Sequence, residues 1–158
     1  MKIRVKVDQA ALNRTVGRLE EYNSDLKEKA NEICQRLASI GAVHASLGFS
    51  RAFYNGESNF DISVEPIENG DAVIAGGDTV LFLEFGAGVT MGYGHPQAGE
   101  FGMGPGTYPG KGHWDQPYGW WIPGGEHTYG NPPTMAMYNA AKEIEKEVER
   151  VAREVLLS

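Results

Sequence analysis

Histidine and acidic side chains, the residue types that serve in proton transfer and metal binding, gather in one part of the chain. They lie in a glycine-rich tract: His95, Glu100, His113, Asp115, Glu126 and His127. Their spacing contains no H-E-x-x-H or C-x-x-C pattern and no pair of histidines one helical turn apart. We therefore expect loop histidines on a solvated surface, with no catalytic residue, no bound metal and no cofactor.

The glycines of this tract superficially resemble loops that bind phosphate through backbone amides. The segments concerned are Gly86-Ala-Gly88 and Gly102-Met-Gly104-Pro-Gly106. A phosphate loop leads directly into a helix N-terminus and ends in Lys-Ser or Lys-Thr, whereas Gly106 leads into more loop. The context therefore argues against nucleotide binding.

Glu84 interrupts an otherwise apolar run between Leu81 and Phe85. A carboxylate in such a place needs hydrogen-bond partners, because burying it unpaired is costly. The amides of residues 86–88 are the nearest candidates, so we expect Glu84 to fix the start of the loop that follows. An ion pair across a subunit boundary is the alternative, and a lone carboxylate is weak support for acid-base chemistry.

The tract also carries an aromatic cluster: Trp114, Tyr118, Trp120 and Trp121. Three roles are open, namely a local core beneath the loop, a contact surface for another protein, or a platform that stacks on sugars or bases. Structureless loops longer than about 15 residues are uncommon in compact domains, and disordered linkers are poor in aromatics. We expect the long loop, residues 87–133, to order against its own domain or a neighbouring subunit.

The N-terminal region predicts a strand followed by helices. Ile3, Val5 and Val7 alternate with charged residues, as in a short strand with one apolar face. Asp8 is a good N-cap for a helix that follows at once. The apolar stripe of this helix is Leu12, Val16 and Leu19.

A break or kink is expected near Asn23, since Gly17 and the Tyr22–Asp25 stretch weaken a helix. A second helical stripe then recurs at spacings of four and three: Leu26, Ala30, Ile33, Leu37 and Ile40. Gly41 is one predicted end, and a last turn as far as Phe49 is the alternative. Cys34 lies alone within this pattern, so no internal disulfide forms and a reducing compartment fits.

The next region predicts an antiparallel hairpin. Its strands are residues 59–66 and 71–75, and Asn69-Gly70 supplies the tight turn. Phe60, Ile62 and Val64 would share one face of the first strand. The apolar run of residues 79–86 fits either a buried strand or a buried helical turn.

The last helix opens at Pro132-Pro133-Thr134, with Thr134 or Asn131 as its cap. Its predicted apolar stripe is Met137, Ala141, Ile144, Val148, Val151 and Val155. Glu149 and Arg153 are spaced to form an ion pair on the opposite face.

The bulk composition is that of one ordinary globular domain. The chain has 158 residues, 41% hydrophobic and 22% charged. The net charge of −7 disfavours wrapping nucleic acid, although an acidic wall would let DNA slide past. Neither a signal peptide nor about 18 consecutive apolar residues is found, so we expect neither export by that route nor a membrane location.

Two segments carry a family resemblance: Val80-Leu-Phe-Leu-Glu-Phe-Gly-Ala-Gly88 and His127-Thr-Tyr-Gly-Asn-Pro-Pro-Thr-Met-Ala-Met-Tyr138. Together with the order of elements, they resemble the minor capsid or tail-completion family of long-tailed bacteriophages. Members commonly show a Glu-Phe-Gly-Thr-Gly segment and a Pro-rich entry into the final helix. This chain departs in having Ala87 for the threonine and no Val-Asp-Thr-Gly-x-Leu motif at residues 41–50.

The resemblance implies a neck component at the head-tail junction of the virion, assembled in the bacterial cytoplasm as a homo-oligomeric ring of about six copies. Its partners would be a head-side connector or adaptor and a tail-side terminator or tube protein, with DNA passing through without sequence-specific binding. The candidate interface residues are Glu84, Phe85, Gly86, Trp114, Tyr118, Trp120, Trp121, Pro132, Pro133, Met135 and Met137.

We therefore interpret residues 1–158 as one α+β domain, a structural protein without catalysis. N-terminal helices and a C-terminal helix pack on a small, mainly antiparallel sheet. The alternative is a ligand-binding or hydrolytic module built on the loop residues His113, Asp115, Glu126 and His127, with the tryptophans as glycan platforms. A capsid accessory or tail-tube cap is a third possibility.

Overall fold

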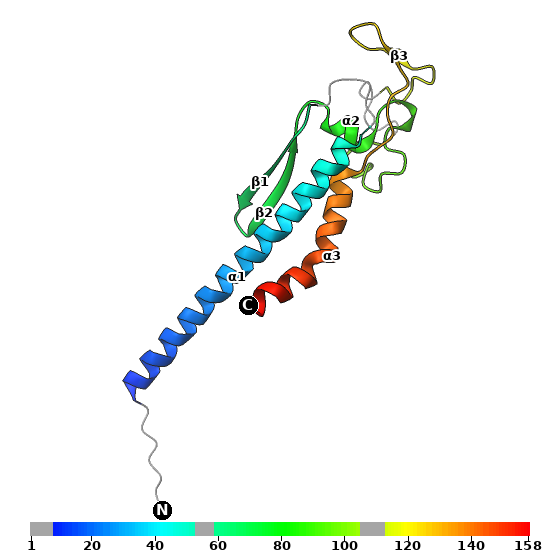
Figure 1. The fold of residues 1–158 in the computed structure, drawn as a ribbon. Helices are drawn as coiled ribbons and strands as arrows, with labels where there is room; N and C mark the ends of the chain where they lie inside the picture. The colour runs from blue at the N-terminus through cyan, green and yellow to red at the C-terminus, as the bar shows by residue number, and fades with distance from the viewer. Residues whose placement is uncertain (1–7, 53–58, 105–112) are drawn as a thin grey trace, which may run out of the picture.

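The computed structural model describes residues 8–52, 59–104 and 113–158. Their elements are α1 (Gln9–Ser50), β1 (Asp61–Ile67), β2 (Gly70–Gly76), α2 (Val80–Phe85), η1 (Gly88–Thr90), β3 (Trp120–Trp121), β4 (His127–Thr128) and α3 (Ala136–Leu156). The fold is α+β as predicted, with α3 and the β1–β2 hairpin beside α1 and the long loop at one end (Figure 1). The predicted strand at Ile3, Val5 and Val7 lies outside the described residues.

One long helix, α1, lies alongside α3 and the β1–β2 hairpin, and its first half extends beyond them (Figure 1). It begins as predicted, with the Asp8 side chain accepting a hydrogen bond from the Ala10 N–H at 3.1 Å. The predicted break near Asn23 is wrong, because α1 continues for 42 residues, past Gly41, to Ser50. The polar side chains around Asn23 are exposed, so they stay solvated and cost only their modest helix propensity. Within the described residues, no helix is both long enough and apolar enough to cross a membrane.

Small residues let α3 pack closely and antiparallel on the C-terminal half of α1. A Cβ added at Gly48 would lie 2.7 Å from the Ala136 Cβ, and one at Gly41 would lie 2.5 Å from the Ile144 Cδ1. These pairs run in opposite order along the two helices. Such contacts bring the helix axes together and leave no room for larger side chains.

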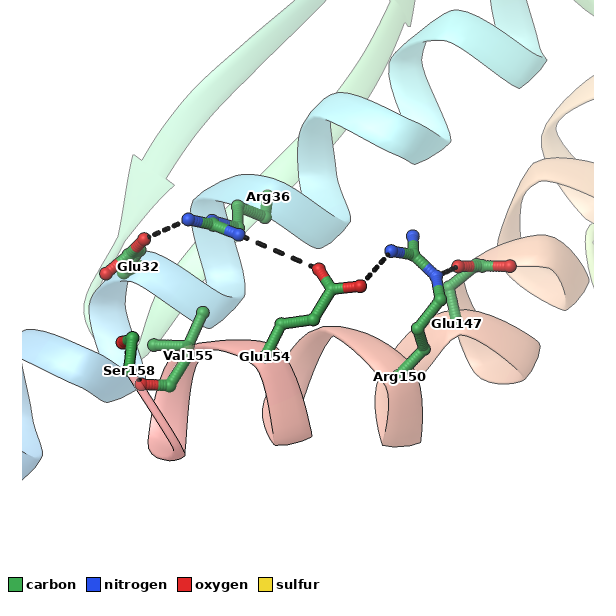
Figure 2. Close-up of polar contacts among 7 residues, drawn as sticks. All are labelled: Glu32, Arg36, Glu147, Arg150, Glu154, Val155 and Ser158. Atoms are coloured by element: carbon green, nitrogen blue, oxygen red, sulfur yellow. Dashed lines mark hydrogen bonds and ion pairs between the residues drawn. The ribbon is translucent and has the colours of Figure 1, made fainter.

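Charged side chains extend the contact between α1 and α3 towards the C-terminal end of α3 (Figure 2). Arg36 lies 3.8 Å from Glu154 across the two helices, and Glu32, Arg150 and Glu147 continue the alternation of charge. Hydrogen bonds to the Glu147 and Glu154 carboxylates raise the pKa of Arg150. Exposed ion pairs stabilise only weakly, so the apolar contacts carry most of the packing energy.

The predicted hairpin forms beside α1, with its turn one residue earlier than predicted. Ile67 pairs with Gly70, so Glu68 and Asn69 make the loop in place of Asn69 and Gly70. Gly70 has φ of 147° and approaches α1, where an added Cβ would lie 3.4 Å from the Cys34 Sγ. Gly70 thus serves a close contact with the helix as well as the turn.

The main core lies where the C-terminal end of α1 meets α2 and the start of α3. Its buried residues are Phe49, Val80, Leu83 and Ala136. Phe60 and Ile62 pack against it as expected, whereas Val64 of the same predicted face is 38% exposed. The run that fitted either a strand or a helical turn is the helix α2.

The buried face of α3 matches the predicted stripe only towards the C-terminal end, at Val151 and Val155. The buried residues are Ala136, Ala140, Val151 and Val155, whereas Ala141 and Val148 are exposed. The contact between Ala136 and Gly48 places the side of α3 that carries Ala136 and Ala140 against α1. The predicted pair on the outer face does form, with Arg153 donating to Glu149 at 2.7 Å.

The close approach at Gly48 predicts that Gly48→Ala destabilises the protein. The new methyl group would meet the Cβ and Cα of Ala136, which cannot move without shifting α3. We expect the free energy of unfolding, measured by urea denaturation, to fall by about 2 kcal/mol even after the gain in helix propensity.

The matched control is Gly17→Ala in the same helix, because a Cβ at Gly17 would meet no atom within 4 Å. This variant should keep or raise the helical circular-dichroism signal and the stability. Equal losses in the two variants would contradict the packing of α1 on α3.

Candidate functional site

The two ends of the long loop, residues 87–133, lie side by side next to α2 and the start of α3. Ala87 and Asn131 exchange backbone hydrogen bonds, with N···O distances of 2.8 and 3.2 Å. The Thr90 hydroxyl lies 2.9 Å from the carbonyl oxygens of both residues. We call this junction, residues 84–90 and 129–138, the loop base.

Glycine is required at the loop base because backbone segments touch there. Gly88 has φ of 71°, and a Cβ would lie 2.2 Å from the Tyr129 carbonyl oxygen. Gly130 has φ of 89°, and a Cβ would lie 2.2 Å from the Ala87 carbonyl oxygen. Gly86 abuts Pro133 in the same way. The glycines of residues 86–88 therefore allow two chain segments to meet.

Glu84 lies at the centre of the loop base with only 5% of its surface exposed. Its carboxylate accepts hydrogen bonds from the backbone N–H groups of Met137 at 2.9 Å and Tyr138 at 3.0 Å. These amides belong to the first turn of α3, whose N-cap residue Met135 provides no side-chain cap. Glu84 supplies the cap from 53 residues away, and the positive end of the helix dipole stabilises its charge.

His95 is the third partner of this carboxylate. Its Nε2 lies 3.1 Å from Glu84 Oε1, and only 1% of its side chain is exposed. The Gln97 N–H donates to His95 Nδ1 at 3.2 Å, so the ring proton lies on Nε2 and faces the carboxylate. The Phe85 ring packs on the imidazole with a centroid distance of 4.3 Å. The prediction of a solvated loop histidine is therefore wrong for His95.

The prediction that Glu84 binds the amides of residues 86–88 is also wrong. Side chains on an α-helix lean towards its N-terminus, so a glutamate on α2 does not reach forward to the residues that follow it. Nor do the predicted caps act on α3. Asn131 instead donates to the Phe82 carbonyl at 2.8 Å, and the Thr134 hydroxyl has no hydrogen-bond partner within the described residues.

The Pro-rich segment enters α3 through a constrained turn. The N–H groups of Thr134 and Met135 donate to the carbonyls of Leu83 and Glu84 at 2.9 and 3.2 Å. Met135 has φ of 54°, which is sparsely populated for a residue with a side chain. Among the predicted interface residues here, Pro132 is exposed, whereas Pro133, Met135 and Met137 are half-buried. This segment therefore joins elements within the subunit.

The first part of the loop builds a small core of its own. Its buried residues are Phe85, Met91, Ala98 and Met103, and Trp114 packs against them. Of the three roles left open for the aromatic cluster, Trp114 therefore takes that of local core.

Of the other clustered aromatics, Trp120 and Trp121 belong to a second hairpin, β3–β4, and Tyr118 lies in the turn before it. This hairpin lies at the end of the molecule away from the start of α1 (Figure 1). Trp120 is half-buried and stacks on His113, with a centroid distance of 4.2 Å. Trp121 is 70% exposed and Tyr118 is 86% exposed. Large aromatic side chains held in solvent on an ordered hairpin are typical of a contact surface.

Three aromatic rings form a row on this hairpin, which we call the aromatic face: Trp121, His127 and Tyr129. His127 contacts Trp121 and Tyr129 edge-on, each with a centroid distance of 5.0 Å. Tyr129 is 66% exposed and was not among the candidate interface residues. The two-residue spacing of His127 and Tyr129, which puts both on one side of an extended chain, is the signal that could have found it.

The residues of the hydrolytic alternative do not gather into a metal site. In the part of the chain that the structure describes, no three His, Cys, Asp or Glu side chains lie close enough to hold a metal ion. His113 and His127 contact aromatic rings, and Asp115 and Glu126 are exposed. Comparisons of the chain with protein-family models, curated proteins and solved structures found no match.

Because the Glu84 carboxylate accepts hydrogen bonds from buried donors, we expect Glu84→Ala to destabilise the protein strongly. The substitution leaves two helix amides and the His95 Nε2–H buried without an acceptor. We expect the free energy of unfolding in urea to fall by about 3 kcal/mol or more, and by less for Glu84→Gln, which keeps one acceptor oxygen.

Glu149→Ala is the control, since it removes a glutamate whose side chain is 85% exposed in its ion pair. Its effect should stay below about 1 kcal/mol. Comparable losses at the two positions would show that Glu84 does not hold the loop base together.

Proposed function

We propose that this protein is a structural subunit of a tailed bacteriophage or prophage virion, which joins head to tail and performs no catalysis. The observation that carries the proposal is the loop base, which anchors an aromatic loop to the start of α3. The aromatic face then contacts a neighbouring neck protein. The family resemblance of the segments around Glu84 and Pro132 supports the same role.

The loop base suits a docking element because it fixes where the loop begins and ends. Glu84, His95 and the paired backbone of Ala87 and Asn131 lock the junction, while Trp121 and Tyr118 stay in solvent. Aromatic side chains contribute most to a protein interface when they are presented on rigid supports. The described β3–β4 hairpin is thus ready to bind without first having to fold.

The charge of the chain is compatible with a place around the DNA passage. A net charge of −7 repels the phosphate backbone and would let DNA pass without sequence-specific binding. In this proposal about six copies form a ring by heterologous contacts, which repeat two different patches until the circle closes. A head-side connector or adaptor and a tail-side terminator or tube protein are the expected partners.

The test is electron microscopy of particles made when the gene is silenced in the phage that encodes it. We expect full heads and finished tails lying apart. Normal, joined virions would refute the joining role.

Complementation with loop variants then tests the aromatic face. Trp121→Ala should fold normally, because the side chain is 70% exposed, yet restore few or no joined particles. The controls are Asp115→Asn and Glu126→Gln, which remove exposed carboxylates from the same loop and should restore joining fully. Loss of joining in these controls, with Trp121→Ala active, would favour the hydrolytic or ligand-binding module instead.

A further inference from the structure

The N-terminal half of α1 lacks a partner within the described residues. Figure 1 shows α3 ending beside the middle of α1, so that the first half of α1 extends beyond the rest of the body. Every residue from 8 to 28 is exposed. Four apolar side chains there are 39 to 62% exposed: Leu12, Val16, Leu19 and Leu26.

The continuity of α1 joins its apolar positions into a single heptad register. The apolar residues of the sequence recur at alternating spacings of four and three. Because the helix has no break at Asn23, all of them lie along one continuous stripe. The d positions are Leu12, Leu19, Leu26, Ile33 and Ile40, and the a positions are Val16, Asn23, Ala30 and Leu37. A strict repeat of this kind is the pattern of a coiled-coil seam.

The last part of this seam already has a neighbour. Leu37 borders a shallow groove together with Ala141 and Ile144 of α3. Ile40 borders another with Val151 and Glu154. The C-terminal part of the seam is therefore flanked by α3. Its N-terminal part, residues 12–30, is covered by no described element.

We propose that residues 9–30 of α1 pair with the same segment of a second copy of this chain in a parallel, in-register, two-stranded coiled coil. Leucine at d and a β-branched residue at a favour two strands over three or four, and Leu12, Leu19, Leu26 and Val16 fit that rule. This pairing does not depend on the proposed function.

Asn23 is the strongest reason to assign the seam to an identical helix in register. A single asparagine at an a position meets its own copy in a parallel dimer, and the two amides hydrogen-bond across the seam. In an antiparallel pair an a residue faces a d residue, and every d residue in this segment is leucine. Two Asn23 amides would then be buried without partners, at a cost of roughly 1 to 3 kcal/mol each.

The flanking residues do not oppose the parallel arrangement. In a parallel pair each g residue meets the following e residue of the partner, which matches Thr15 with Glu20 and Tyr22 with Lys27. No like charges meet at these positions. An antiparallel pair could match Glu20 with Lys27, but exposed ion pairs contribute at most about 1 kcal/mol and do not offset the buried amides.

The first test is the mass of the full-length chain by sedimentation equilibrium over a range of concentrations. We expect a reversible dimer. Leu19→Lys should raise the dimer dissociation constant about a hundredfold, whereas Glu21→Lys, on the outer side of the same turn, should leave it within about threefold. Asn23→Leu should tighten association and give a mixture of higher oligomers.

Disulfide cross-linking tests direction and register. In a Cys34→Ser background, Val16→Cys and Ala30→Cys should both link under mild oxidation, since each residue faces its own copy at both ends of a parallel seam. Glu28→Cys, at an outward position, should not link. An antiparallel pair would link at most one of the two seam positions.

A chain that stays monomeric at every concentration would overturn the proposal. Linking at Glu28→Cys as efficiently as at the seam would overturn it too, because the contact would then be non-specific. The unchanged circular dichroism expected of the Leu19→Lys monomer would show that the body folds without the pairing.

Discussion

The buried carboxylate of Glu84 is the interaction on which the rest of the structure depends. Three donors converge on it: the first-turn amides of α3 and the imidazole of His95. Removing a carboxylate from water costs several kcal/mol, and hydrogen bonds to a charged group return about 1.5 to 3 kcal/mol each. The desolvation cost and the hydrogen bonds nearly cancel, so the net gain in stability is small. Few alternative arrangements remain, however, because any other packing of α2 and α3 would leave the carboxylate buried without hydrogen-bond donors. Glu84 therefore specifies how the two helices meet.

Local features of the fold could be predicted from the sequence. Asp8 as a cap, the β1–β2 hairpin and the ion pair of Glu149 with Arg153 each depend on residues a few positions apart. The need to satisfy a carboxylate at position 84 could be predicted as well. Its partners could not, because they come from residues 95, 137 and 138, and only the folded chain brings these together.

Two wrong predictions have different origins. The polar residues around Asn23 predict a helix break, yet their propensity cost is small beside the cost of ending one helix and nucleating another. The spacing of apolar residues in α3 predicts a buried face that includes Val148. The close contact of Ala136 with Gly48 instead buries the face that carries Ala136 and Ala140. For α3, a tertiary contact thus decides between faces that the one-dimensional pattern leaves nearly equivalent.

The loop base also separates two properties that are usually linked, the length of a loop and the stability of the body beneath it. Since Ala87 and Asn131 already meet and pair, the two ends of the loop are held together by their own contacts and not by the β3–β4 hairpin at its tip. Doubling a flexible loop adds only about 0.6 kcal/mol of closure entropy. Insertions and deletions in the turn of the β3–β4 hairpin should therefore cost little folding free energy. The length of this tip can therefore change while the helices and the first hairpin stay as they are.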